Sequence, residues 1–521
     1  MSSSTSVADS QLAPGSTTQR FWDRGWRKPI LITAIATVLV IALGTILGIK
    51  YWPFSEASVI KNLSEVADST VTVRSYHPTY FPPGCTVEGV EFRHDRFKLI
   101  TIERLVIQGS YPGILVRHIP RITAEGTRVF IPVLGSHIEF HSQHSNLAVE
   151  ELIANGTVVE LMSDDLRNVS LQFDVHEAQL NSVRWGKPIA YRLKFHNPNP
   201  PGEIAVSGKF GAWADGHPQD TPLSGDYSFD RADLGVYGGI AGMLSSTGKF
   251  DGVFKHIDIH GTTDTPDFEI TSGGHKVKLT TKFDAYVDVT RGDTFLNRVE
   301  AKFRRTLVIA TGSIAGSQGQ DGKSAKLRLS TRNGRIEDIL GLFVTAPHSP
   351  MSGAVSLAAR AEIPPGDRPF LERVRLNGSF GVDDGSFSTP ETQRDVDALS
   401  AGARGRNKED PETVLTDLKG NVDLSDGVAK FSDLAFGVPG ANSRMQGTYN
   451  IVNHKIDLHG QMRIDTRISQ TSSGMKSFFL KVMDSFFKKK NKGEIVPVHI
   501  LGTYEKPLFG LDLMNDQAKP K

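Results

Sequence analysis

The most chemically suggestive side chains in the sequence form a short alternating run of histidine and glutamate. His137, Glu139 and His141 recur at every second residue in SHIEFHSQH, and His144 follows three residues later. Side chains two residues apart on a strand share a face at a spacing of about 7 Å, which is compatible with a zinc site. A half-buried strand shows the same polar residues to water, however. The strand interpretation is simpler, so we predict no metal ligand.

Other signals of catalysis are weaker. The loop SQGQDGKS, Ser317 to Ser324, imitates a phosphate-binding loop, but Ser317 stands where the first glycine belongs and Gly316 comes one residue too early. His256 and His260 lie about 13 Å apart along a strand, too far to chelate one metal. No carboxylate pair or nucleophile constellation is evident, which argues against a membrane-anchored hydrolase of envelope polymers. We predict no catalytic residue, no cofactor and no enzyme activity.

Composition excludes several further classes of function and indicates the fold class. The 521 residues carry 59 basic and 58 acidic side chains and a net charge of +1. A nucleic-acid partner usually requires a basic surface, so we predict no binding to nucleic acid. Cys85 is the only cysteine, so an intramolecular disulfide is excluded. The 50 glycines and the apolar fraction of 39% indicate a turn-rich β-protein.

One segment predicts a membrane anchor. Residues 30–49 are uncharged and long enough to cross a hydrocarbon core of about 30 Å as a helix. A cleaved signal peptide is the alternative, but the apolar run is too long and no small-residue cleavage site follows it. Four basic residues precede the run: Arg20, Arg24, Arg27 and Lys28. The positive-inside rule then places a disordered tail, residues 1–27, in the cytoplasm, residues 28–52 in the inner membrane as a single-pass anchor, and the bulk of the chain in the periplasm.

Beyond the anchor, apolar residues recur with the period of two that is typical of half-buried strands. The pattern predicts long antiparallel hairpins with one apolar face, joined by turns at Asp251-Gly252, Asp426-Gly427 and Asn453-His454. We expect a mostly β fold: an elongated, curved antiparallel β-groove with a few short helices. The candidate groove-lining residues are Leu279, Phe283, Val287, Leu327, Leu329, Gly447, Ile456, Leu458, Gly460 and Ile464.

A glycine between two apolar residues on the same strand face recurs along the chain. The central glycines are Gly208, Gly225, Gly312, Gly378, Gly420, Gly447, Gly460 and Gly502. Any one of them could serve an ordinary turn or bulge. Because all eight fall on apolar faces, we expect each to open a hollow and to bend a sheet whose concave side is apolar.

Three short helices are predicted, at residues 335–343, 389–403 and 473–490. The last has an aromatic face and a cluster of lysines at its end, with Phe478, Phe479, Phe486, Lys488, Lys489 and Lys490 as candidate membrane-surface residues. Packing on the sheet, with the lysines favoured by the helix dipole, is an equal alternative. We therefore divide the extracytoplasmic chain into a β-groove at 53–400, an exposed loop at 401–412, a C-terminal β-region at 413–513 and a tail at 514–521.

The predicted helices are too few to cover the apolar side of such a sheet. A large apolar surface left open to water normally marks an interaction site. A membrane-anchored trough of this kind suits acyl chains, because its lining shields the tails while the head group stays in water. Membrane phospholipid is the partner that this arrangement favours.

The sequence resembles the AsmA-like family of envelope proteins from Gram-negative bacteria. The resemblance rests on the N-terminal anchor and on residues 76–92 (YHPTYFPPGCTVEGVEF), 195–213, 221–252, 260–270, 418–462 and 485–513. It implies a repeating β-groove related to bridge-like lipid-transfer proteins, phospholipid movement between inner and outer membrane, and support of outer-membrane integrity. An outer-membrane or envelope protein is the partner implied at the C-terminal end. The alternative is a non-transport protein that restrains outer-membrane protein assembly through protein contacts.

Overall fold

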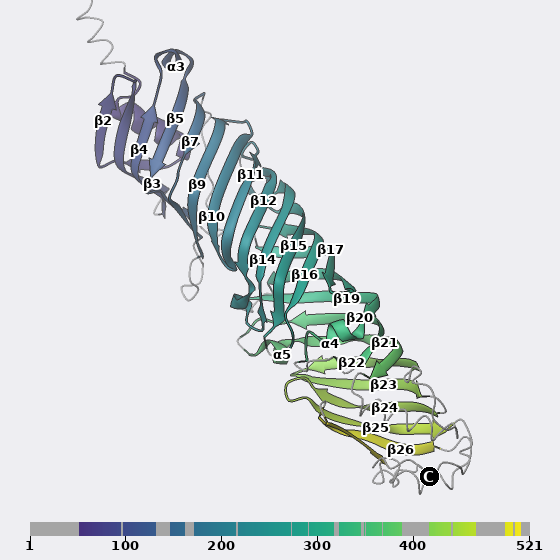
Figure 1. The fold of residues 1–521 in the computed structure, drawn as a ribbon. Helices are drawn as coiled ribbons and strands as arrows, with labels where there is room; N and C mark the ends of the chain where they lie inside the picture. The colour runs from purple at the N-terminus through teal and green to yellow at the C-terminus, as the bar shows by residue number, and fades with distance from the viewer. Residues whose placement is uncertain are drawn as a thin grey trace, which may run out of the picture. The chain divides into compact units, whose positions relative to one another are not determined.

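The computed structural model describes residues 52–511 except 95–96, 132–145, 162–170, 215–216, 272, 290, 317–321, 345–348, 350, 367, 388–415, 439–440, 465–494 and 504–505. The chain divides into two units, residues 1–62 and residues 63–521. The second unit contains every described strand, and these strands form one long curved sheet (Figure 1). The prediction of a mostly β chain with few helices is confirmed for the described residues.

The sheet contains 27 described strands, which lie side by side nearly in chain order (Figure 1). The first part comprises β1 (Thr70–Thr72), β2 (Ser75–Thr79), β3 (Gly84–His94), β4 (Phe97–Gln108), β5 (His118–Glu125), β6 (Arg128–Ile131), β7 (Ala148–Ile153), β8 (Thr157–Leu161) and β9 (Leu171–Arg184). The middle part comprises β10 (Ile189–Pro198), β11 (Pro201–Phe210), β12 (Pro222–Asp233), β13 (Ile240–Ala241), β14 (Met243–Val253), β15 (His256–Ile270), β16 (Val277–Asp288), β17 (Asp293–Phe303) and β18 (Thr306–Gly316). The last part comprises β19 (Lys323–Arg335), β20 (Met351–Ile363), β21 (Arg375–Phe387), β22 (Thr416–Ser425), β23 (Val428–Val438), β24 (Ala441–Asn450), β25 (Lys455–Ile464), β26 (Ile495–Thr503) and β27 (Lys506–Leu511).

The strand arrangement departs from a simple antiparallel meander near the N-terminal end. Strand β5 pairs with β7 in parallel, and β6 pairs with β8 in parallel. Parallel neighbours need a connection of about a dozen residues or more. Residues 126–147 separate β5 from β7 and residues 132–156 separate β6 from β8, so both pairs meet this requirement. The remaining described pairings are antiparallel, as expected, and β21 pairs with β22 across the loop predicted at 401–412.

The turns agree with the prediction at two of three places. Asp426 and Gly427 form the turn between β22 and β23, and residues 451–454 form the turn between β24 and β25, where His454 has a φ of 60°. The Asp251-Gly252 turn is wrong, because both residues belong to β14 and the turn falls at residues 254–255. At Gly252 an added Cβ would lie 2.2 Å from the backbone oxygen of His256, so the glycine there permits close strand contact.

Bulges recur along the sheet and help to curve it. Register shifts interrupt the pairings of β16 with β17, β17 with β18, β19 with β20, and β23 with β24. A bulge bends its strand and increases the local right-handed twist. Curvature is therefore built into many successive hairpins rather than into one hinge.

The described helices are short: α2 (Glu56–Ala67), α3 (Tyr111–Val116), α4 (Ile336–Leu340), α5 (Phe370–Arg373) and the 3-10 turns η1 (Pro218–Asp220) and η2 (Leu234–Tyr237). Helix α4 confirms in part the helix predicted at 335–343. The other helices and turns were not predicted. No helix within the described residues has both the length and the apolar character needed to cross a bilayer. Several predicted segments lie outside the described residues: the anchor at 30–49, the helices at 389–403 and 473–490, the exposed loop at 401–412, and the terminal segments 1–27 and 514–521.

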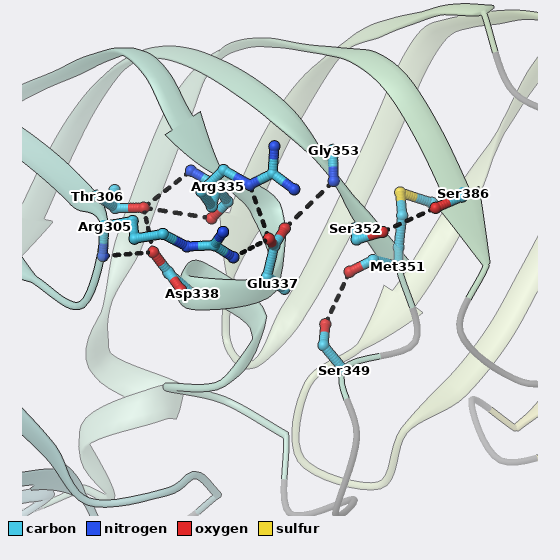
Figure 2. Close-up of polar contacts among 10 residues, drawn as sticks. All are labelled: Arg305, Thr306, Arg335, Glu337, Asp338, Ser349, Met351, Ser352, Gly353 and Ser386. Atoms are coloured by element: carbon cyan, nitrogen blue, oxygen red, sulfur yellow. Dashed lines mark hydrogen bonds and ion pairs between the residues drawn. The ribbon is translucent and has the colours of Figure 1, made fainter. Parts of the chain in front are cut away.

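A buried polar network fixes α4 where β19 ends (Figure 2). Asp338 is 2% exposed, and its carboxylate accepts hydrogen bonds from the Thr306 hydroxyl at 2.9 Å and the Arg305 backbone N–H at 3.0 Å. Glu337 accepts from Arg335 at 2.7 Å and from the Gly353 backbone N–H at 3.2 Å. Burial raises the pKa of Glu337, but hydrogen bonds from backbone N–H groups and Arg335 outweigh burial and lower this pKa overall. The network ties the turn before β18 to the starts of α4 and β20.

Candidate functional site: the apolar face of the sheet

The strand register places apolar residues in two unbroken rows that cross the sheet from β9 to β26. Residues paired across neighbouring strands share a face, so a chain of such pairs is a row on one side of the sheet. The first row consists of Ala178, Leu193, Val206, Tyr227, Gly248, Gly261, Phe283, Val299, Ala310, Leu329, Ala359, Gly378, Val422, Phe431, Gly447, Leu458 and Ile500. No charged residue interrupts it.

The second row runs beside the first, two residues away along each regular strand. It consists of Leu180, Tyr191, Gly208, Gly225, Phe250, Ile259, Ala285, Leu296, Gly312, Leu327, Ala361, Leu376, Leu424, Ala429, Tyr449, Ile456 and Gly502. It also contains no charged residue. We call the side of the sheet that carries both rows the apolar face.

All ten predicted lining residues lie on the apolar face by register. Phe283, Leu329, Gly447 and Leu458 belong to the first row, and Leu327 and Ile456 belong to the second. The other four flank the rows on the same strand faces: Leu279, Val287, Gly460 and Ile464. The period-two pattern therefore assigned residues as far apart in the sequence as Leu279 and Ile464, which are 185 positions apart, to the same face of the sheet. Contact of these residues with lipid stays a prediction.

The apolar face is partly exposed along most of its length. Phe283, Leu329 and Leu458 are neither buried nor fully exposed. Among the described residues there is one sheet and no second sheet layer, and the main helix–strand contacts are those of α3 with β5 and of α4 with β19 and β20. Most of the face therefore lacks a protein layer within the described part of the chain.

The glycines do not open the hollows that the sequence predicts. At Gly225 an added Cβ would lie 2.5 Å from the Ser207 backbone oxygen and 3.0 Å from the ring of Phe250. At Gly447 it would lie 2.1 Å from the Asp457 backbone oxygen. A backbone oxygen of the neighbouring strand is also the nearest obstacle at Gly208, Gly312, Gly378 and Gly460. The expectation of open hollows is wrong at these six positions, and the glycines instead allow close packing of strands and rings.

Tyrosines on the apolar face carry no charge near neutral pH. Burial raises the pKa of Tyr191 to about 12, and its hydroxyl donates to the Ser224 backbone oxygen at 3.2 Å. Burial also raises the pKa of Tyr227, although a hydrogen bond with Ser246 lowers it in part. Their rings can therefore line an apolar surface without presenting an unsatisfied hydroxyl.

The opposite face is polar, and ion pairs join its neighbouring strands. Lys249 lies 3.1 Å from Asp226, and His260 lies 3.2 Å from Asp284. Asp284 also accepts a hydrogen bond from Asn297 at 2.9 Å. These exposed pairs add little stability individually, but they show which side of the sheet is adapted to water.

Three hollows in the structure are lined mostly by residues of this polar face. The largest, about 1100 Å³, follows polar-face residues such as Thr311, Arg328, Arg360 and Asn377 across β18 to β21. A second, about 1040 Å³, follows Ile309, Ser330, Ala358 and Ser379 in the same way. The apolar face is thus best described by its continuous rows and not by a single pocket.

The other candidate sites are not assembled. His256 and His260 are exposed, and they pair with Asp258 and Asp284 respectively. The described residues contain no group of three or more potential metal ligands. The run His137, Glu139, His141 and His144, most of the phosphate-loop mimic, and the membrane-surface candidates Phe478, Phe479, Phe486 and Lys488 to Lys490 lie outside the described residues.

Cys85 is a packed residue at the N-terminal end of the sheet. It is 1% exposed, and burial raises the pKa of its thiol to about 11 despite a hydrogen bond with Tyr76. We expect a maleimide at neutral pH to leave the native chain unmodified and to label Cys85 after denaturation, as followed by intact mass. Because an unfolded thiol with an ordinary pKa near 9.0 loses its proton first, this residue should also reduce stability as pH rises from about 9 towards 11. Rapid labelling of the native chain would contradict this assignment.

No protein-family model, curated protein or solved structure matches the chain. The geometry of the two faces is therefore the basis for assigning a function.

One group of exposed apolar residues was not predicted from the sequence. Phe81, Leu115 and Val116 are large apolar residues exposed by 87%, 86% and 72%. They lie in the connections YFPP and YPGILV, where proline and glycine indicated turns and drew attention away from the apolar side chains. The signal available in the sequence was the lack of any charged residue in either connection.

Proposed function

We propose that this chain is an inner-membrane-anchored periplasmic protein that holds phospholipid acyl chains on its apolar face and transfers them between envelope membranes. The observation that carries the proposal is the pair of uncharged rows that continue from β9 to β26 without a break. A lipid tail moving along such a surface meets apolar side chains at every strand. The resemblance to AsmA-like proteins points in the same direction and adds a role in outer-membrane integrity.

The energetics of such transfer are undemanding. Each CH₂ group taken from water into an apolar environment contributes about 0.8 kcal/mol, so a tail leaving the bilayer loses little if the sheet receives it directly. The charged polar face would stay in water throughout. Transfer of this kind needs no catalytic group, and its direction must come from the lipid gradient or from a partner.

Neighbouring residues on opposite faces provide the test. A photo-crosslinking amino acid is placed at Phe283 or Leu329, on the apolar face, and at the adjacent exposed positions Lys282 or Arg328 as matched controls. After irradiation of cells that express the full chain, adducts are identified by mass spectrometry. We expect phospholipid adducts at Phe283 and Leu329 and few at the controls.

The same experiment can overturn the proposal. Equal lipid labelling on both faces would show that the rows do not guide lipid. Adducts with protein alone at Phe283 and Leu329 would instead favour the regulator that restrains outer-membrane assembly through protein contacts.

A further inference from the structure

Two connections at one end of the N-terminal strands form a single ordered tip. Residues 80–83 join β2 to β3, and α3 follows β4, so both lie where β3 begins and β4 ends. The Gly109 backbone N–H donates to the Pro83 oxygen at 2.7 Å, and the Tyr111 hydroxyl donates to the Tyr80 oxygen at 2.7 Å. We name the exposed apolar residues of these connections the aromatic tip: Tyr80, Phe81, Tyr111, Leu115 and Val116.

The aromatic tip presents its apolar side chains to solvent although its backbone is well fixed. Phe81, Leu115 and Val116 are 87%, 86% and 72% exposed. The Ser110 side chain caps α3 by accepting from the Gly113 N–H at 3.1 Å, and the backbone oxygen of Arg117 accepts from Ala148 on β7 at 3.0 Å. The exposure is therefore a property of a folded element, and exposed clusters of this kind mark an interaction surface.

The chemistry of the tip fits a lipid surface. Residues 78–84 and 109–117 contain no acidic side chain, and their single charged residue is the cation Arg117. Tyrosines with an apolar ring and a polar end are enriched where membrane meets water, and a cation is favoured by the negative surface of anionic lipids. Phe81 and Leu115 supply apolar side chains of the kind that enter the boundary between head groups and acyl chains.

Chain length allows the tip to reach the membrane that holds the predicted anchor. Between the end of the predicted anchor at Ile49 and Thr70, helix α2 accounts for 12 residues, or about 18 Å, and residues 52–55 form a turn before it, so this segment reaches roughly 40 Å at most. The tip lies one length of β3 from Thr70, about 35 Å. The segment between the predicted anchor and Thr70 is therefore long enough for the tip to contact the membrane that holds the anchor.

We propose that the aromatic tip inserts into the interfacial layer of the phospholipid membrane in which the chain is anchored. This contact holds one end of the sheet against the lipid surface. It does not depend on whether the apolar face carries lipid, because a different set of residues makes it.

The test uses the full chain in vesicles of phosphatidylethanolamine with a minor share of phosphatidylglycerol. The variant Leu115→Cys is labelled with an environment-sensitive fluorophore, and buried Cys85 stays unlabelled. Val452→Cys, in the turn between β24 and β25 and 52% exposed, is the matched control. We expect a blue-shifted emission at position 115 that is quenched by doxyl-labelled phospholipids, and a water-like, unquenched emission at position 452.

Two results would overturn the proposal. One is an emission at position 115 that is as water-like as the control. The other is a blue shift at position 115 without doxyl quenching, which would mean that protein rather than lipid covers the tip. Phe81→Cys, labelled in the same way, tests whether the result at position 115 is a local effect of one substitution. The proposal requires the same blue shift and the same doxyl quenching at both positions. The lipid crosslinks at Phe283 report on the proposed function separately, so either idea can fail alone.

Discussion

Replacing Leu458 by Asp is expected to remove most of the lipid that accompanies the purified full chain. Leu458 lies in the first row between Gly447 and Ile500, and its side chain is only partly covered. Loss of a leucine contact costs about 2 kcal/mol of apolar burial. The new carboxylate adds a desolvation penalty where acyl chains would pass. Phospholipid content per protein, measured by mass spectrometry, should fall at least severalfold.

Gln461→Asp is the matched control for this substitution. Gln461 lies on the same strand, β25, but on the polar face, where it is exposed and opposite Arg444. Both variants introduce the same charge, and both should keep the thermal midpoint of unfolding close to that of the unaltered chain. Unchanged lipid content in a folded Leu458→Asp variant would count against the apolar face as the lipid site.

Replacing Gly447 by Ala is expected to destabilise the hairpin of β24 and β25. Gly447 has a φ of 148°, and an added Cβ would lie 2.1 Å from the Asp457 oxygen and 2.8 Å from the Leu458 Cα. Because these obstacles are backbone atoms, the strands must separate or the backbone must shift. Strain of this kind costs about 1–3 kcal/mol. The thermal midpoint should fall, and hydrogen exchange in residues 441–464 should rise more than elsewhere.

Gly316→Ala tests whether the effect belongs to the close strand approach or to glycine in general. Gly316 ends β18, and an added Cβ there would meet nothing within 4 Å. We expect no loss of stability for this variant. Comparable destabilisation by both substitutions would refute the close-contact explanation, and no destabilisation by Gly447→Ala would refute it as well.

Strand positions could be predicted because apolar and polar residues alternate along a half-buried strand, and this alternation is visible in the sequence. Leu279, Phe283 and Val287 share a face in β16 as their period of two requires. Period carries no information on strand direction, however, so the parallel pairing of β5 with β7 was not foreseen. The Asp251-Gly252 turn failed for a related reason: a glycine that permits close strand contact looks the same in a sequence as one that reverses the chain.

The sequence predicted which residues share the apolar face, but it did not predict the shape of that surface. The same period that defined each strand also assigned Leu329 and Leu458 to a common side, since each pair in the register preserves the side. What lies above a glycine depends on side chains from other strands, such as Phe283 over Gly261, and no local pattern contains that information. The aromatic tip was missed because its members come from two connections about 30 residues apart.

The nearly sequential order of the strands has a consequence for how the protein is made. After β9, apart from the short β13, each strand pairs with its immediate predecessor, so a newly delivered hairpin needs no residue that has not yet arrived. Such stepwise contacts resemble those of solenoid proteins, in which structure propagates from neighbour to neighbour. A chain threaded across a membrane from its N-terminal side could therefore fold as it emerges. At the growing end, only the most recent strand would present an open edge, and each new strand would cover it.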